Sequence, residues 1–289
     1  MTGTGARWLV GALIVACVLI AGPGATNAER VADPLPAGAP AKPVPNRVMT
    51  WNICNPCKDG DPNAGRAKEI ATYAPQVIGL QEACVGDVER IVEQLRYRYG
   101  LVYHVTYGSV LRSWSRCGGV PWKPGGFGQA ILSAAPITDA VNTEYPDGGS
   151  EDRGYLAVTT LVDGRPVRVF NTHFAERRQE PVRAKQAEAL AKVVGRYDRT
   201  IVLGDFNAVP EAAELAPMWR LFADADAQCG PSGPGGCTPT TDWRSKFDYI
   251  FLRGFAPAGQ RVHLTPYSDH DLVAAEVRRA DPGSVSRRR

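Results

Sequence analysis

Residues 201–207 read Ile-Val-Leu-Gly-Asp-Phe-Asn, and this stretch indicates the fold more strongly than any other part of the chain. Three apolar residues of strand type come first, and Gly204 allows the tight backbone turn that ends the strand. Asp205 and Asn207 then place a carboxylate and a carboxamide at the strand end, where α/β proteins commonly position their chemistry. The stretch therefore predicts an α/β fold with polar site residues at the end of a buried strand.

Further polar clusters lie beside apolar strands along the chain. They comprise Asn52, Gln81-Glu82, Asn171-Thr172-His173, Asp248-Tyr249 and Ser268-Asp269-His270. Each cluster alone is a weak signal, because such residues also occur in ordinary turns. Together, and with residues 128–133 (Gly-Gln-Ala-Ile-Leu-Ser) and Pro136, the ordered set resembles the endonuclease/exonuclease/phosphatase superfamily. That superfamily includes deoxyribonuclease I-like nucleases, bacterial sphingomyelinases and inositol polyphosphate phosphatases.

The resemblance runs from about Arg47 to Val277, with Gln129 at a position where the family more often has asparagine. It implies an α/β (α+β) fold, a four-layer α/β/β/α sandwich in which helices flank two packed mixed β-sheets. The 289 residues, 44% hydrophobic and 22% charged, are typical of a soluble globular protein. Because the motifs span nearly the whole chain, we expect one domain over residues 46–279. A formal net charge of +3 is too small to indicate nucleic-acid binding by itself.

Apolar spacing predicts the other elements. Helices are expected over 61–73, 87–99 and 180–196, and strands over 47–53, 155–161, 167–170, 248–252, 261–264 and 272–277. In the second helix, the apolar stripe of Val88, Ile91, Val92 and Leu95 is interpreted as core. In the third helix, the residues expected on one side are Val182, Gln186, Leu190 and Val193. The basic residues expected on a solvated face are Arg177, Arg178, Arg183 and Lys185.

The resemblance also assigns a metal site. Glu82 matches a metal ligand, a hard oxygen anion that suits Mg²⁺ or Mn²⁺. Asn52 resembles the asparagine that helps to place the metal and the phosphate. Asp269 is expected close to the metal, either as a ligand or as a residue that supports one.

The catalytic residues implied by the resemblance are Asp205, Asn207, His173, His270 and Asp248. Asp205 would orient and deprotonate the attacking water, and Asn207 would donate to the phosphate. His270 would be held by Asp248, which fixes its tautomer and favours the imidazolium. His173 would face the phosphate as a general acid or as an electrostatic clamp. The other histidines, His104 and His263, match no motif and are interpreted as structural or surface residues.

The substrate class stays open at this stage. Residues 110–128 contain Arg112, Trp114, Arg116, Trp122, Lys123 and Phe127. Such a mixture can stack bases along a nucleic acid, line a lipid headgroup site, or form an ordinary loop held by Cys117. We favour a nuclease-like phosphodiesterase that acts on nucleic acid as a monomer. The alternatives are a phospholipid or sugar-phosphate phosphoesterase and, from a different class, a catalytically dead binding module.

The N-terminal segment resembles an export signal. Arg7 is the only charged residue before Glu29, and residues 8–21 are almost all apolar, so residues 1–28 are expected to be a secretory signal peptide. An alternative is a lipoprotein box ending at Cys17, which would attach the protein to the membrane surface. Residues 29–45, rich in Ala and Pro, are expected to be an extended linker, and residues 280–289 a disordered basic tail.

Cysteine usage is consistent with export. Without Cys17, the chain has six cysteines: Cys54, Cys57, Cys84, Cys117, Cys229 and Cys237. An even number in an exported protein suggests up to three disulfides. Cys229 and Cys237 bracket a Gly/Pro-rich loop and are expected to pair. Cys54 and Cys57 form a CxxC spacing that also occurs in redox and zinc sites, but we expect them to bond with Cys84 or Cys117.

Overall fold

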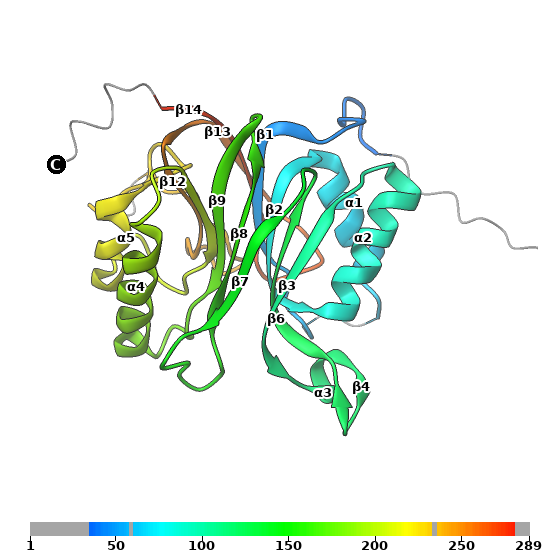
Figure 1. Ribbon diagram of the computed structural model, residues 1–289, viewed down its shortest axis with the longest axis horizontal. Helices are drawn as coiled ribbons and strands as arrows, with labels where there is room; N and C mark the ends of the chain where they lie inside the picture. Colours follow the sequence, from blue (N-terminus) through cyan, green and yellow to red (C-terminus); the bar gives the residue numbers. More distant parts are fainter. Residues whose placement is uncertain (1–34, 58–59, 233–235, 281–289) are drawn as a thin grey trace, which may run out of the picture. The chain divides into compact units, whose positions relative to one another are not determined.

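The computed structural model describes residues 35–57, 60–232 and 236–280, all of which belong to one compact unit. Two six-stranded mixed sheets pack against each other, and helices cover the outer face of each sheet (Figure 1). The predicted four-layer sandwich is confirmed. The predicted signal peptide (1–28) with Cys17, residues 29–34 of the predicted linker and residues 281–289 of the predicted tail lie outside the described residues.

The first sheet has the strand order β13-β14-β1-β2-β6-β3. Its strands are β1 (Val44–Asn52), β2 (Pro75–Cys84), β3 (His104–Arg112), β6 (Gly126–Ser133), β13 (Phe255–His263) and β14 (Leu272–Arg279). Only β1 and β2 are parallel; every other neighbouring pair in this sheet is antiparallel. β1 begins two residues inside the predicted linker, and β13 begins six residues before the strand predicted at 261–264.

The second sheet has the order β11-β12-β10-β9-β8-β7. Its strands are β7 (Thr138–Glu144), β8 (Gly154–Val162), β9 (Arg165–His173), β10 (Thr200–Asp205), β11 (Ala223–Asp224) and β12 (Asp248–Arg253). Here β9 and β10 are the parallel pair, and the remaining pairs are antiparallel. Each sheet therefore has a central parallel pair whose two carboxyl ends lie at the same edge.

Alternating side chains separate three hydrophobic layers. Along β1, Met49 packs toward the helices of the first sheet, whereas Val48 packs between the two sheets. Along β10, Ile201 and Leu203 enter the layer between the sheets, and Val202 faces the helices of the second sheet. A strand buried on both faces has apolar residues at successive positions, which explains the continuous apolar run at 201–203.

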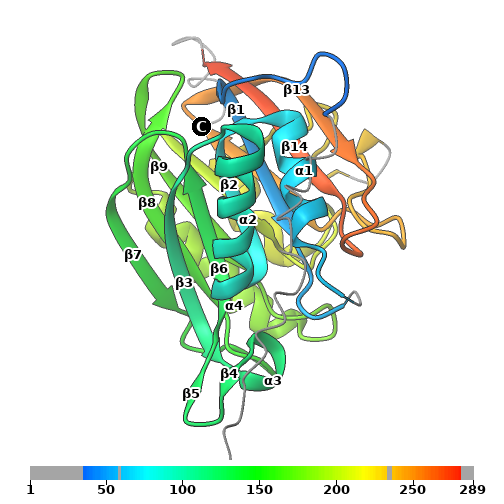
Figure 2. The same cartoon turned by 90° about the vertical axis from the view of Figure 1, so that its right-hand side faces the viewer.

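The helices lie on the two outer faces (Figures 1 and 2). Those on the first sheet are α1 (Asn63–Tyr73) and α2 (Val85–Tyr99); those on the second are α4 (Glu180–Val194), the 3₁₀ helix η1 (Ala213–Leu215) and α5 (Ala216–Leu221). In α2, Val88, Ile91 and Leu95 are buried and Val92 packs against them, as predicted. No helix within the described residues is long and apolar enough to cross a membrane.

The buried face of α4 is displaced by about one residue from the face predicted to be buried. Its buried residues are Arg183, Gln186, Ala187, Leu190 and Val194. Arg183, predicted on a solvated face, is buried and forms an ion pair with Glu214 at 2.7 Å. The guanidinium tolerates burial because a buried carboxylate partner offsets its desolvation.

The disulfide pairing corrects one prediction and agrees with another. Cys54 bonds to Cys57, and Cys84 bonds to Cys117, so the expected link from Cys54 or Cys57 to Cys84 or Cys117 was wrong. Cys229 bonds to Cys237, as the bracketed loop predicted. The Cys84–Cys117 bond ties α3 (Trp114–Cys117) to the end of β2.

A small arm projects from one edge of the first sheet (Figure 1). It consists of α3, β4 (Gly119–Val120) and β5 (Lys123–Pro124). Trp122 is 84% exposed and Trp114 is 57% exposed, whereas Phe127 at the base of the arm is buried. Since Cys117 is bonded to Cys84, the base of this arm is fixed beside the polar cluster that contains Glu82.

Candidate active site

Strand register brings the predicted catalytic residues to one end of the sandwich. Asp205, the last residue of β10, is opposite His173 on the parallel strand β9 and opposite Asp248 on the antiparallel strand β12. In the first sheet, Asn52 ends β1 opposite Gln81, next to Glu82. The carboxyl ends of both parallel pairs therefore supply one site.

Asn52 links the two sheets at this site. Its Nδ2 donates to Glu82 Oε1 at 3.1 Å and to Asp205 Oδ2 at 3.0 Å. Its Oδ1 accepts a hydrogen bond from the backbone N–H of Cys54 at 2.9 Å. The amino group of Asn52, rather than its oxygen, thus faces the two carboxylates. This geometry suits the role expected from the sequence, in which Asn52 helps to place the metal and the phosphate.

The carboxylate of Glu82 is more accessible than that of Asp205. Its side chain is 27% exposed, compared with 1% for Asp205. The backbone of Glu82 has φ of +50°, in the left-handed region that non-glycine residues rarely adopt. Glu82 lies at the point where the pairing of β2 with β6 changes register. Burial of the carboxyl group raises the pKa of Glu82 above its ordinary value, and the hydrogen bond from Asn52 opposes this shift.

Asp205 is buried at the centre of the site. Its Oδ1 accepts from the backbone N–H of Asn207 at 2.8 Å, while its Oδ2 lies 3.4 Å from His173 Nε2 and 3.6 Å from His270 Nε2. Desolvation raises the pKa of Asp205 to about 7, although the charge of His270 opposes the shift. A carboxylate with a pKa near neutrality is suited to accept a proton.

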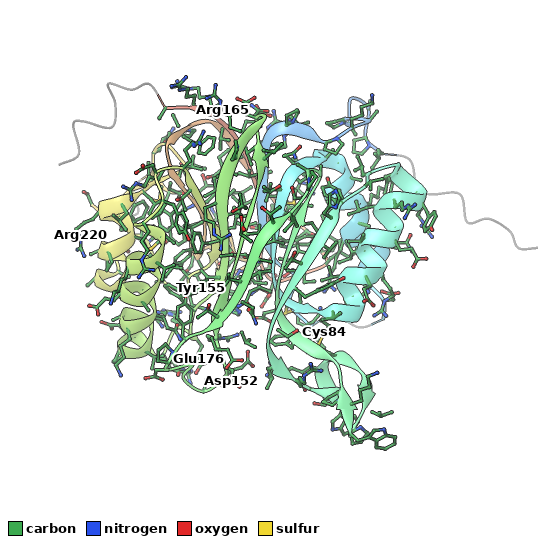
Figure 3. All side chains as sticks on the ribbon, viewed as in Figure 1. Cys84, Asp152, Tyr155, Arg165, Glu176 and Arg220 are labelled. Carbon is green, nitrogen blue, oxygen red and sulfur yellow. A yellow bond between two sulfur atoms is a disulfide. The ribbon has the colours of Figure 1, made fainter. Side chains whose placement is uncertain are left out.

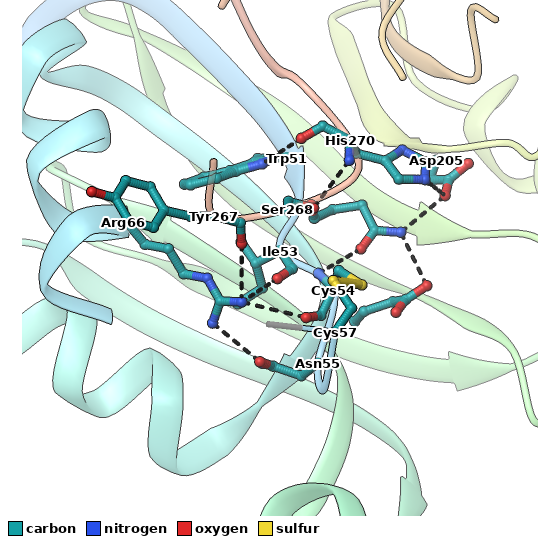
Figure 4. Close-up of a disulfide and its surroundings, with 12 residues drawn as sticks. Trp51, Ile53, Cys54, Asn55, Cys57, Arg66, Asp205, Tyr267, Ser268 and His270 are labelled. Atoms are coloured by element: carbon teal, nitrogen blue, oxygen red, sulfur yellow. Dashed lines mark hydrogen bonds and ion pairs between the residues drawn. A yellow bond between two sulfur atoms is a disulfide. The ribbon is translucent and has the colours of Figure 1, made fainter. Parts of the chain in front are cut away.

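Asp248 and His270 form the predicted dyad. His270 Nδ1 lies 2.9 Å from Asp248 Oδ2, which also accepts from the hydroxyl of Thr240 at 2.7 Å. Burial lowers the pKa of His270, but the charges of Asp248 and Asp205 outweigh it and raise the pKa to about 10. His270 is therefore an imidazolium at neutral pH, with its Nε2–H directed toward Asp205 (Figure 4).

His173 has a cationic partner, which the sequence did not reveal. Arg153 Nη1 lies 3.0 Å from His173 Nδ1. Asn207 Nδ2 lies 3.1 Å from His173 Nε2 and also donates to the carbonyl of Phe174. Burial, followed by the charges of Arg153 and His270, lowers the pKa of His173 well below its ordinary value. His173 is consequently neutral.

Asp269 lies beside the Cys54–Cys57 disulfide. Its carboxylate is within 4.8 Å of both sulfur atoms, which are committed to their bond and are poor metal ligands. The cluster of Asp205, Asp248 and His270 is equally compact. The protonated His270 has no free lone pair for a metal ion and is instead a hydrogen-bond donor in that cluster.

Other motif residues hold the framework. Gln81 Nε2 donates to Asn171 Oδ1 at 2.6 Å, and Asn171 Nδ2 donates to the carbonyls of Leu80 and Ala130. These bonds cross the interface between the sheets and fix the relative position of their strand ends. Of the two remaining histidines, His263 pairs with Glu69 at 2.9 Å, and His104 is exposed on β3.

The comparison with known families agrees with this geometry. The model of the "Endonuclease/Exonuclease/phosphatase family" matches residues 49–270. The chain belongs to the endonuclease/exonuclease/phosphatase family. Enzymes of this family hydrolyse phosphoester bonds and depend on divalent metal ions. No curated protein gives a significant match to the sequence.

Solved structures of the family share the fold. A Beutenbergia cavernae endonuclease/exonuclease/phosphatase is 24% identical, with a TM-score of 0.65, over 81% of this chain and 71% of that one. The human Nocturnin catalytic domain with bound sulfate is 24% identical, with a TM-score of 0.63, over 82% and 95%. D. rerio TDP2 complexed with single-strand DNA product is 18% identical, with a TM-score of 0.65, over 80% and 98%. At these identities the likeness establishes the fold.

Proposed function

We propose that the protein is a secreted, Mg²⁺- or Mn²⁺-dependent phosphodiesterase, a nuclease of deoxyribonuclease I-like type. The observation that carries the proposal is the convergence of Glu82, Asp205 and His270 at one end of the sandwich. Asn52 contacts the two carboxylates, and His270 lies beside the second of them. A cation-binding group, a base and a cationic donor are what phosphate ester hydrolysis requires.

The donor set fits a hard divalent cation. Glu82 offers a partly exposed carboxylate oxygen, and Asp269 adds a second carboxylate on the neighbouring loop. Glu82 would hold the ion, while Asn52 fixes the orientation of Glu82. When bound, the ion would neutralise phosphate charge and polarise the P–O bond.

Asp205 is the proposed base. It receives hydrogen bonds from Asn52 and from the backbone of Asn207, which orient its carboxylate without satisfying all of its acceptor capacity. With a pKa of about 7, it is partly deprotonated at neutral pH and can take the proton of an attacking water.

Two donors of different charge flank Asp205. His270 carries a positive charge and directs Nε2–H to the side where phosphate charge develops. His173 is neutral, and its Nε2 faces the carboxylate oxygen Oδ2 of Asp205 at 3.4 Å, to which it would donate. This division supports an electrostatic and positioning role for His173, rather than the general-acid role left open by the sequence.

Nucleic acid is the favoured substrate. The arm that carries the exposed tryptophans and basic residues is fixed at its base beside Glu82, an arrangement suited to stacking bases and contacting a backbone. The structure of D. rerio TDP2 complexed with single-strand DNA product supports the same choice by analogy. All proposed catalytic residues come from one chain, which is consistent with a monomeric enzyme.

Export is the proposed localisation. The apolar segment after Arg7 and the three disulfides both support it, since disulfides persist in oxidising compartments. A lipid on Cys17 would instead retain the protein at the cell surface, and mass spectrometry of the mature N-terminus distinguishes the two.

A substrate panel tests the proposed function. The purified protein with Mg²⁺ would be incubated with plasmid DNA, RNA, sphingomyelin and phosphorylated inositols. We expect release of nucleotides or nicked plasmid, with no choline phosphate from sphingomyelin. Hydrolysis of sphingomyelin or inositol phosphates, with nucleic acids untouched, would overturn the nuclease assignment and retain the phosphoesterase.

A further inference from the structure

A polar cleft opens directly beside Glu82. It has a volume of about 260 Å³ and is lined by Cys54, Asn55, Pro56, Glu82, Arg116, Glu151 and Arg153. Each water in the liquid takes about 30 Å³, so the cleft has room for several waters or a group of similar size. Since Glu82 is part of its wall, a group in this cleft would adjoin the phosphate held at the metal site.

Two guanidinium groups share a single carboxylate in this wall. Glu151 Oε1 pairs with Arg153 at 2.6 Å, and Glu151 Oε2 pairs with Arg116. Glu82 and Glu151 together balance the two guanidinium groups, so a divalent cation held by Glu82 would leave the wall with a net positive charge toward a phosphate. Arg153 is mostly buried and also contacts His173, whereas the side chain of Arg116 is 38% exposed. Arg116 is thus the accessible cation of the cleft.

The position of Arg116 is fixed from two sides. Its guanidinium lies 5.0 Å from the centre of the buried Phe127 ring. The next residue, Cys117, is bonded to Cys84, which follows Glu82 by two positions. Arg116 and Glu82 consequently face the cleft from a covalently connected frame, which lowers the entropy lost when a ligand binds.

The opposite wall is equally constrained. Arg66 donates to the carbonyls of Ile53 and Cys54 and to the side chain of Asn55 (Figure 4). The Cys54–Cys57 bond closes the same loop. Both walls of the cleft are therefore held in place by buried or covalent contacts.

We propose that this cleft binds a second phosphate group of the substrate, adjacent to the phosphate that is hydrolysed. The inference rests on the proposed function and narrows its substrate class. A guanidinium presents paired N–H donors that match phosphate oxygens, which favours phosphate over a neutral sugar or base. The second phosphate belongs to a nucleotide chain or to a sugar that carries neighbouring phosphates.

Matched dinucleotides test the subsite. TpT has one phosphate, and pTpT and TpTp each add one phosphate at a different end. With Mg²⁺, we expect kcat/KM for pTpT or TpTp to exceed that for TpT by about tenfold, the effect of one charge-assisted contact. Arg116→Ala should bring this ratio close to one. Arg220→Ala is the control, because Arg220 lies on the outer helix layer, away from Cys84 (Figure 3), and should preserve the ratio.

The outcomes separate the subsite from the proposed function. Equal kcat/KM values for all three dinucleotides in the wild type would overturn the subsite, and so would a preference that survives Arg116→Ala. If the dinucleotides, plasmid DNA and RNA all stay intact, the nuclease function fails, and inositol mono- and bisphosphates are compared in the same way. An Arg116-dependent preference for the bisphosphate then supports the subsite with a sugar phosphate as its source; no such preference overturns it.

Discussion

Arg153 Nη1 lies 3.0 Å from Nδ1 of His173, so a permanent cation donates a hydrogen bond to this ring nitrogen. The corresponding nitrogen of His270 faces a carboxylate, Asp248, at 2.9 Å. An arginine cannot accept a hydrogen bond, whereas His173 Nε2 faces an acceptor, Asp205 Oδ2, at 3.4 Å. We therefore assign the ring proton of His173 to Nε2, although Nε2 also lies 3.1 Å from the amide nitrogen of Asn207. Asp248 therefore keeps His270 protonated as an imidazolium, whereas Arg153 keeps His173 neutral.

The Arg153→Met substitution should remove the contact that holds His173 in the tautomer with its proton on Nε2. Without the donor, Nδ1 can carry the proton and Nε2 no longer donates toward the site, so kcat should fall by about 10- to 100-fold. Nitrogen-15 NMR of the metal-free protein reads the tautomer directly, and the wild type should show Nε2–H. Arg153→Lys keeps a cationic donor and should recover part of the loss. A wild-type spectrum with the proton on Nδ1 would refute the assignment.

The pH–rate profile should be bell-shaped. Asp205 must be deprotonated to act as a base, and its pKa is raised to about 7, so kcat/KM should rise with pH up to that region. A bound cation favours the carboxylate and shifts this limb to lower pH. His270 must stay protonated, so activity should fall as pH passes its pKa of about 10. A profile with its maximum on the acid side of the Asp205 titration would contradict both roles.

Asp248→Asn should leave the fold intact and lower activity by about 10- to 1,000-fold, because a neutral amide no longer stabilises the imidazolium. His270→Ala removes the donor itself and should cost more. The double variant should be no worse than His270→Ala alone, since residues that act as one unit are not additive. Fully multiplicative losses would show that Asp248 acts elsewhere.

The three disulfides should differ in their contribution to stability. The Cys84–Cys117 bond spans 33 positions and the Cys229–Cys237 bond spans 8. Loop-closure entropy then predicts losses of about 4 and about 3 kcal/mol, respectively, when each pair is replaced by serine. Urea unfolding of the two variants tests the order. Six free thiols in the secreted wild type would overturn the disulfides and the argument for export.

Local sequence pattern predicted the parts of the fold that depend on nearby residues. The apolar run 201–203 and the stripe in α2 have the periods of a buried strand and an amphipathic helix, and both elements formed as expected. The clusters around Glu82, Asp205 and His270 were predictable because each follows or precedes such a strand.

Contacts between distant segments were not predictable. Arg183 is buried because Glu214, 31 residues away, meets it across the outer helix layer. Arg153 contacts His173 because β8 and β9 are antiparallel neighbours, with Gly154 opposite His173. No strand-like run precedes Arg153, so its role has no local signal in the sequence. The Cys54–Cys57 pairing likewise depends on a tight loop conformation that spacing alone leaves open.

The central claim is that Glu82 holds a divalent cation that phosphodiester hydrolysis requires. Metal titration of a Glu82→Gln variant tests this claim most directly. Glu89→Gln is the matched control, because Glu89 is exposed on α2 and lies outside the site. Hydrolysis of bis(p-nitrophenyl) phosphate should stop after EDTA treatment and return with Mg²⁺ in the wild type and in Glu89→Gln. Glu82→Gln should need at least about tenfold more Mg²⁺ and turn over at least about 100-fold more slowly. Full activity after exhaustive chelation, or a Glu82→Gln variant equal to the wild type, would contradict the account.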